Sequence, residues 1–290
     1  VLVIITIMTQ FYKSREEIIK KQPTPAAFTK WLDVRFEEVK ESIKPELQNA
    51  VDVLSKQINS WGNVPHLEIE ARIGYFDEDT QGNAMFPFDT DIGKEWYDAI
   101  IEDLNNDPTI ISKEESFTTD YLAGTYRLTI DNKNQTRHAI NKTTLEHSNF
   151  RYINSPFDLR VSFCREVPIT VQQFQKKAEA MKASPNDFRK KTRITYHTNH
   201  WKYDITRVDY KKEQIERSSY QVEIEAKLEN IPYHDYIYMA DSLLLKVQKL
   251  VNVCEPEESD EEREMCFLPS ISKKYVSVEE MAEKLKNIEI

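Results

Sequence analysis

The segment His66–Gly74, HLEIEARIG, alternates charged and apolar residues with a period of two. Successive side chains of a β-strand point to opposite faces, so this period gathers Glu68, Glu70 and Arg72 on one face. The other face carries only apolar side chains, which need to be buried. The segment therefore predicts a strand with one charged face and one apolar face.

The same alternation recurs at the far end of the strand region, in Val222–Leu228, VEIEAKL, where Glu223 and Glu225 share a face. Between these ends, further segments alternate in the same way: Thr125–Asp131, Phe157–Val167, Phe188–Tyr196 and Trp201–Val208. A weaker case is His138–Glu146, in which Lys142, Thr144 and Glu146 share one side. Carboxylates dominate the first and last strands, and cations dominate the middle ones. A polar face in water explains any single strand of this kind. Rows that face solvent are normally mixed in residue type, however, and these rows are dense in charge.

A closed barrel explains all the strands together. If the charged rows line a central tunnel, the apolar rows face outward and need to be covered by other elements. Amphipathic helical segments lie before, within and after the strand region and are suited to that task. We therefore predict an α+β fold: a closed antiparallel β-barrel of about eight strands that forms a charged tunnel, with helices packed on the outside.

Helical periodicity marks the chain on both sides of the strands. The predicted helical segments are Thr29–Trp61, Gly93–Asn105, Val171–Lys182, Tyr233–Val253 and Ser277–Asn287. We predict four regions, which are an N-terminal extension, partly disordered, at 1–28, a helical segment that packs on the barrel at 29–64, the tunnel barrel at 65–232, and a C-terminal helix, acidic loop and tail at 233–290.

Composition excludes several function classes. Only 5 glycines occur in 290 residues, and no Gly-rich nucleotide-binding turn is present. The net charge of −10 is not that of a basic nucleic-acid coat, so any polyanion must bind at a local basic site. The apolar run 1–7 is too short to span a bilayer, and we expect no membrane partner. Three cysteines without metal-ligand spacing indicate a reduced intracellular compartment.

The tunnel would hold both acids and bases. If the first and last strands meet when the barrel closes, two Glu-x-Glu pairs lie on neighbouring rows. Carboxylate oxygens with water are the ligands that suit Mg²⁺ or Mn²⁺. The facing cations are Arg127, Lys142, Arg160, Lys191 and Arg193. A metal ion beside Arg and Lys around a polyphosphate is typical of phosphoryl transfer, in which Glu166 would orient the attacking water.

These residues resemble those of the metal-dependent RNA triphosphatases of fungi, protozoa and large DNA viruses, within the triphosphate tunnel metalloenzymes. The resemblance covers roughly Pro65 to Leu228. Its marks, in order, are HLEIEARIG at His66–Gly74, DLRVSFCRE at Asp158–Glu166, RKKTRITY at Arg189–Tyr196, WKYDITRV at Trp201–Val208 and VEIEAKL at Val222–Leu228. A lone Glu-x-Glu motif is weak, whereas five elements in this order are specific.

The resemblance implies a role for each matching residue. It implies metal binding by Glu68, Glu70 and Glu225, and a catalytic set of Glu166, Glu223, Arg127, Lys191 and Arg193. It implies phosphate binding by Arg127, Lys142, Arg160, Lys191, Arg193 and Lys202, and support from Arg72, Asp204 and Thr206. Two positions depart from the family pattern: Arg72 stands where many members carry Lys, and Lys202 stands where many carry Arg.

The reaction that the resemblance implies is hydrolysis of the γ-phosphate of 5′-triphosphate RNA, the first step of mRNA capping, with NTPase activity beside it. Two alternatives stay open: a tunnel enzyme that acts on inorganic tripolyphosphate or thiamine triphosphate, and a non-catalytic polyphosphate-binding module. The helical section ahead of the first strand favours the RNA branch. The set of four carboxylates speaks against a pure binder, which needs only the cations.

The resemblance also implies partners and a location. We expect the 5′-triphosphate end of nascent RNA and NTPs as substrates, Mg²⁺ or Mn²⁺ as cofactor, and a separate mRNA guanylyltransferase as the next enzyme. A homodimer is left open, since fungal members pair. The expected location is the nucleus, or a cytoplasmic replication site for a viral enzyme.

Overall fold

The computed structural model describes residues 48–78, 84–152, 157–184, 187–212, 215–230, 236–254 and 265–268. The predicted extension, the first part of the helical segment, the acidic loop and the terminal helix near residues 277–287 lie outside these ranges. Among the described helices, none has the length and apolar character needed to cross a membrane.

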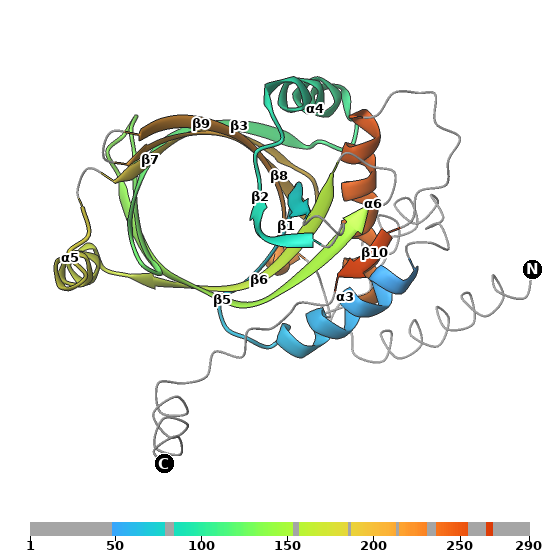
Figure 1. Ribbon diagram of the computed structural model, residues 1–290, viewed down its shortest axis with the longest axis horizontal. Helices are drawn as coiled ribbons and strands as arrows, with labels where there is room; N and C mark the ends of the chain where they lie inside the picture. Colours follow the sequence, from blue (N-terminus) through green and yellow to red (C-terminus); the bar gives the residue numbers. More distant parts are fainter. Residues whose placement is uncertain are drawn as a thin grey trace, which may run out of the picture.

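Eight antiparallel strands form a closed ring, seen end-on in Figure 1. In order around the ring they are β1 (Leu67–Glu78), β6 (Asp158–Ile169), β5 (Arg137–Tyr152), β4 (Tyr126–Asp131), β3 (Ser112–Ala123), β7 (Phe188–His197), β8 (Trp201–Lys212) and β9 (Ile215–Ala226), which returns to β1. Closure removes the strand edges that an open sheet would expose. The predicted barrel is confirmed.

Two further strands lie beside the ring. Strand β2 (Ala84–Asp89) pairs with β1, and β10 (Met265–Leu268) pairs with the end of β5. The approach of β2 is close: a Cβ on Gly74 would lie 2.1 Å from the carbonyl oxygen of Asp89. Glycine at this position therefore lets β2 pack against β1 at one end of the barrel.

The main apolar core lies outside the ring, as the alternation predicts. Helices α3 (Gln48–Trp61), α4 (Lys94–Asn106) and α6 (Tyr236–Val253) cover the outward faces, while α5 (Val171–Ala180) packs elsewhere on the outside (Figure 1). Ile69 and Ile224 of the barrel are fully buried in one cluster with Leu54 of α3 and Leu244 of α6. Each such side chain contributes about 1.5–3 kcal/mol when it is fully buried. Burial of this kind lets the opposite faces remain charged.

One predicted face is wrong, because β5 contains a β-bulge. The register with β6 shifts between Thr144 and Glu146, so that the side chains after the bulge change faces. The sequence pattern grouped Glu146 with Lys142 and Thr144. In the structure, Glu146 accepts hydrogen bonds from Gln57 Nε2 (2.9 Å) and Trp61 Nε1 (2.7 Å) of the external helix α3.

One strand of the ring, β3, was not predicted from the sequence. Strand β3 reads SKEESFTTDYLA, and its first four residues are exposed. It pairs with β4 and β7 and completes the ring. A two-residue turn joins β3 to β4, and Gly124 in this turn has φ of 60°, a conformation that glycine adopts at little cost.

Candidate active site

The barrel encloses a polar cavity of about 330 Å³. Every strand of the ring contributes to its wall, as does Thr90 after β2. The charged lining residues are Glu68, Glu70, Arg72, Asp120, Arg127, Lys142, Glu166, Arg189, Lys191, Arg193, Lys202, Glu223 and Glu225. All the predicted site residues except Arg160, Asp204 and Thr206 are among them. The charged rows therefore do face one shared cavity.

Closure of the ring brings the two Glu-x-Glu pairs together. In the β1–β9 ladder Glu70 lies opposite Glu225, and Arg72 lies opposite Glu223. On the other side of β1, Glu68 lies opposite Cys164, two residues before Glu166. Glu70 is almost completely buried, with 3% of its surface exposed. Four carboxylates thus share one wall, which we call the acid wall: Glu68, Glu70, Glu166 and Glu225.

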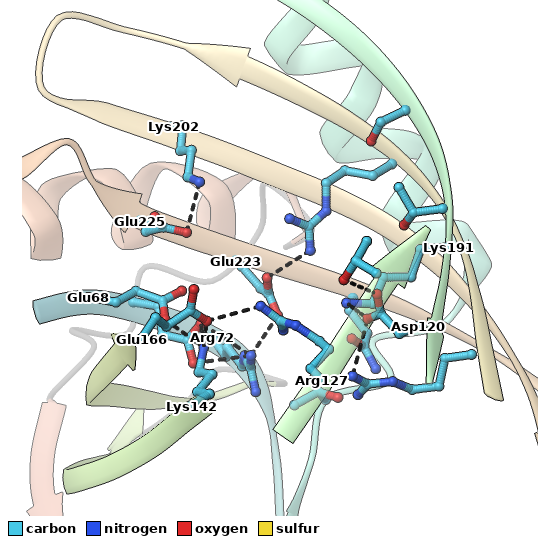
Figure 2. A pocket seen from close by; sticks show the side chains of 18 of the residues that line it. Glu68, Arg72, Asp120, Arg127, Lys142, Glu166, Lys191, Lys202, Glu223 and Glu225 are labelled. Carbon is cyan, nitrogen blue, oxygen red and sulfur yellow. Dashed lines mark hydrogen bonds and ion pairs between the residues drawn. The ribbon is translucent and has the colours of Figure 1, made fainter. Parts of the chain in front are cut away.

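Four cations are paired with the acid wall, one of which is Arg127, 3.0 Å from Glu166. The ammonium of Lys142 lies 2.7 Å from Glu68, 3.3 Å from Glu166 and 3.4 Å from Glu70. Arg72 bridges Glu70 and Glu223, and Lys202 lies 2.9 Å from Glu225. Figure 2 shows Lys142 beside Glu68 and Glu166, with the Lys202–Glu225 pair farther along the cavity.

These cations do not neutralise the acid wall evenly. Burial and then the neighbouring charge of Glu70 raise the pKa of Glu68 to about 9, despite Lys142. Burial also raises the pKa of Glu225, which Lys202 offsets only in part. Burial acts the same way on Glu166, but Lys142 and Arg127 outweigh it and lower the pKa of that carboxyl. The crowding at Glu68 and Glu225 means that further positive charge would be stabilising there.

The other side of the cavity is cationic. Strand β7 contributes Arg189, Lys191 and Arg193 on alternate positions, and β4 contributes Arg127. Burial, together with the charges of Arg193 and Arg189, lowers the pKa of Lys191 to about 8, although Asp120 opposes this. A group of cations that repel one another in this way favours an anion in the space they face.

Arg193 is held from behind by three side chains. Its Nη1 donates to Asp204 (2.6 Å), its Nε donates to Thr206 (2.9 Å), and its Nη2 donates to Glu223 (3.3 Å). Asp204 and Thr206 are each 1% exposed. They lie beneath Arg193 and orient its guanidinium.

Arg160 does not reach the cavity. Its Nε donates to Asn149 Oδ1 at 2.9 Å, and its guanidinium lies 4.7 Å from the ring centre of Phe88 and 5.3 Å from that of Phe76. Burial and the adjacent Arg72 lower the pKa of Arg160 to about 10. The alternation placed Arg160 on the correct face of β6, but its guanidinium lies over aromatic side chains of β1 and β2 and does not line the cavity.

Asp120 is not among the residues predicted from the sequence, because β3, the strand that carries it, was not predicted. The carboxylate is 1% exposed and lies 2.8 Å from Lys191 Nζ and 3.3 Å from Arg189 Nη2. Thr129 Oγ1 donates to it at 2.7 Å. Two signals were available: the TTDYLA run, rich in residues that favour strands, and the glycine that follows it before the next predicted strand.

The donor set fits a divalent cation. Glu68, Glu70 and Glu225 supply carboxylate oxygens from adjacent strands, and burial raises the pKa of Glu68 and Glu225, so that a divalent cation would stabilise their ionised forms. Within the described ranges, no three acidic, histidine or cysteine side chains converge on a single point as ligands. The acid-wall oxygens are instead paired with Lys142, Arg72 and Lys202, whose positive charges lie beside these carboxylates.

The cavity thus joins a set of carboxylates to a set of phosphate-type donors. Figure 2 shows Glu68, Glu166 and Lys142 at one side, and Asp120, Lys191 and Arg127 at the other. Such an arrangement accommodates a cation and a polyphosphate next to each other.

A family model described as "mRNA capping enzyme, beta chain" matches residues 94–252, more than half of the chain. The chain belongs to this family. It is therefore a polynucleotide 5′-triphosphatase of the mRNA-capping type. The match runs from α4 to α6 and includes every strand of the ring except β1.

Two solved structures of one protein, Pct1, show the same fold as this triphosphatase. The Pct1 RNA triphosphatase of S. pombe is 17% identical, with 73% of this chain and 95% of that chain covered and a TM-score of 0.58. A second Pct1 structure, in complex with the Spt5 CTD, gives 17% identity, 73% and 96% coverage and a TM-score of 0.59. The Mimivirus capping enzyme triphosphatase is 15% identical, with 71% and 97% coverage and a TM-score of 0.45. No curated protein matches the sequence.

Proposed function

We propose that this triphosphatase hydrolyses the γ-phosphate of 5′-triphosphate RNA in a reaction that depends on Mg²⁺ or Mn²⁺, and that it also hydrolyses NTPs. The observation that carries the proposal is the cavity itself, in which Glu68, Glu70 and Glu225 face a cluster of Arg and Lys side chains. A polyphosphate-binding module needs the cations but gains nothing from a wall of carboxylates. Family membership supports RNA as the substrate.

The carboxylates of Glu68, Glu70 and Glu225 would hold the metal, and Glu223 would support them through Arg72 and Arg193. When bound, a divalent metal neutralises charge on phosphate oxygens. Burial opposes the ionisation of Glu223, but Arg72 and Arg193 outweigh it and hold its pKa below the usual range. Glu223 therefore stays ionised and keeps both guanidinium groups in position.

The cations of β4 and β7 would bind the triphosphate. Arg127, Lys191 and Arg193 carry N–H donors that match phosphate oxygens, and their side chains are fixed by acids behind them. Lys142 and Lys202 lie within the same cavity. Positioned positive charge stabilises the negative charge that is spread over the transferred phosphoryl group in the transition state.

Glu166 would orient the attacking water. Its Oε1 atom accepts from Arg127 Nη2 at 3.0 Å, and Lys142 lies 3.3 Å away. These cations lower its pKa, so Glu166 is an ionised and weak base at neutral pH. A weak base suits phosphoryl transfer with a loose transition state, in which aligning the water matters more than removing its proton early.

The decisive experiment compares γ-phosphate release from triphosphate-ended RNA, ATP and inorganic tripolyphosphate, with Mg²⁺, with Mn²⁺ and with a chelator. We expect release from RNA and ATP that requires metal. Release from tripolyphosphate alone would favour the small-triphosphate alternative, and no release from any substrate would favour a binding module.

A matched pair of variants tests the site. Glu70→Gln keeps the shape of the side chain and removes one carboxylate from the cavity, and we expect a loss of about 100-fold or more in kcat/KM. Glu216→Gln makes the same change in an exposed pair with Lys211, where we expect no loss. Full activity of folded Glu70→Gln would contradict the assignment.

We also propose that the diphosphate end of the RNA passes to a separate guanylyltransferase and that the protein works in the nucleus, or at a cytoplasmic replication site if it is viral. Family membership supports the partner. Co-purification with a guanylyltransferase and localisation of the tagged protein would test these statements. Homodimer formation stays a prediction, which sedimentation analysis would test.

A further inference from the structure

Lys142 lies in the centre of the acid wall. Its ammonium is within 3.4 Å of three carboxylates, those of Glu68, Glu166 and Glu70. An ammonium has three N–H donors and no acceptor, so three surrounding carboxylates match its capacity. Lys142 therefore occupies the space between two of the carboxylates that would hold the metal.

We propose that Lys142 is a built-in counter-cation of the metal site: its ammonium keeps the carboxylates together before the metal arrives, and metal binding displaces it. This inference rests on the proposed metal dependence. A divalent metal held by Glu68 and Glu70 would lie beside the ammonium that contacts the same two carboxylates, and the two positive charges would repel each other. Metal binding is then an exchange of one cation for another.

The chain offers reasons for such a device. Without positive charge between them, Glu68 and Glu70 would repel each other, since both side chains are largely shielded from water. The ammonium of Lys142 lies where it supplies such a charge, 2.7 Å from Glu68 and 3.4 Å from Glu70.

Geometry also provides a place for the displaced ammonium. Lys142 lies directly opposite Glu166 in the β5–β6 ladder, and Glu166 contacts Arg127 of the cationic side. A lysine has a flexible four-carbon stem, so its ammonium can leave Glu68 and Glu70 and keep Glu166 as a partner. Arg72 has no such freedom, because its guanidinium bridges Glu70 and Glu223.

Displacement would move the ammonium toward the phosphate-binding side, where the same charge serves the substrate. The site would therefore bind the divalent metal more weakly than the same carboxylates would without Lys142. Removing the Lys142 charge is expected to tighten metal binding, although it removes a cation from the phosphate site.

The test measures Mn²⁺ binding by electron paramagnetic resonance at pH 7, where Lys191 also carries its charge, in the full-length protein and without substrate. Lys142→Met and Lys142→Gln remove the charge at the acid wall. Lys191→Met removes the same charge from the same cavity, at a lysine that pairs with Asp120 and not with the acid wall. We expect both Lys142 variants to bind Mn²⁺ at least tenfold more tightly than wild type, and Lys191→Met to change the affinity by less than about threefold.

A second measurement, the unfolding temperature, detects a loss of stability in the metal-free variants. Lys142→Met should unfold at a lower temperature than wild type without metal, and Mn²⁺ should raise its Tm by more than it raises that of wild type. Equal or weaker Mn²⁺ binding by both Lys142 variants, beside saturable binding by wild type, would overturn this inference alone. An equal gain in Lys191→Met would also overturn it. Absence of Mn²⁺ binding by wild type would overturn the metal-dependent function itself.

Discussion

The ammonium of Lys191 lies 2.8 Å from the carboxylate of Asp120, an acid that is buried beneath the cationic side of the cavity. Burial opposes the ionisation of Asp120, but Lys191 outweighs it and lowers the pKa of the carboxyl. The same carboxylate lies 3.3 Å from Arg189. One buried anion therefore fixes two of the side chains that face the phosphate site.

Replacing Asp120 should damage both stability and catalysis. Asp120→Asn leaves Lys191 and Arg189 buried without their counter-charge, a change that costs about 3 kcal/mol in the free energy of unfolding. Misplacement of these cations should lower kcat/KM by about 100-fold. Urea unfolding and steady-state kinetics measure the two effects. Asp209→Asn, in an exposed pair with Arg207, is the control and should change stability by less than about 0.5 kcal/mol.

Tripolyphosphate should restore part of the stability of Asp120→Asn, because an anion in the cavity compensates the same cations. The ligand should raise the Tm of the variant by more than that of wild type. An Asp120→Asn protein as stable and as active as wild type would show that the cations hold their positions without it.

The pKa of Lys191 predicts how substrate binding changes with pH. Because this pKa is lowered to about 8, the side chain loses its charge above that pH, and KM for triphosphate should rise up to tenfold per pH unit. Lys191→Arg stays charged at all accessible pH values and should move the rise in KM to higher pH. Lys211→Arg, on the exposed end of β8, is the control and should keep the wild-type profile.

Alkaline unfolding is distinguishable from this effect by its sign. The pKa of an unfolded lysine is about 10.4, so between about pH 8 and 10.4 the unfolded chain binds the extra proton. The contribution of Lys191 to stability therefore rises with pH over the range in which substrate affinity falls. A KM that is constant from pH 7 to 9 would contradict the lowered pKa.

The faces of the strands were predictable from the sequence, because a period of two fixes which side chains lie together. Glu68, Glu70, Glu223 and Glu225 follow directly from it. Strand β3 is harder to recognise in this way, since only the second half of its outward face is apolar: Lys113 and Glu115 are exposed there, and Tyr121 and Ala123 pack in a small core cluster. The tunnel residue Asp120 was lost with it.

Two other features depend on information that alternation does not contain. A β-bulge in β5 inserts one residue and reverses the faces that follow, which moved Glu146 out of the tunnel. Alternation also gives the face of a side chain but not its depth along the barrel axis. Arg160 points to the correct side of β6, but the aromatic residues of β1 and β2 surround it at one end of the barrel.

The bulge leads to a prediction about Glu146. Outside the barrel it binds α3 through Gln57 and Trp61, so Trp61→Phe should lower the free energy of unfolding by about 2 kcal/mol, the contribution of a hydrogen bond to a charged group. Because this contact lies far from the cavity wall, kcat/KM should stay within about twofold of wild type. Glu146→Gln should behave alike, whereas Glu166→Gln, inside the tunnel, should reduce activity strongly. Strong loss of activity in stable Glu146→Gln would place that residue in the site.

For Arg160, the sequence and the structure predict different roles. Alternation assigned it to the phosphates, whereas its guanidinium donates to Asn149 and stacks on Phe88. A cation over an aromatic ring contributes about 0.5–2 kcal/mol, so Arg160→Met should lower stability by about that amount. It should leave KM for triphosphate within about threefold, while Arg193→Met, at a residue that lines the cavity, should raise KM by more than tenfold. Arg160→Lys keeps the charge but not the planar group, and it should lose nearly as much stability as Arg160→Met. If Arg160→Met instead raises KM as much as Arg193→Met, and Arg160→Lys restores it, the charge of Arg160 reaches the substrate. In that case the side chain would leave Phe88 when the triphosphate binds, and the assignment of Arg160 to the phosphates from the alternation would be correct.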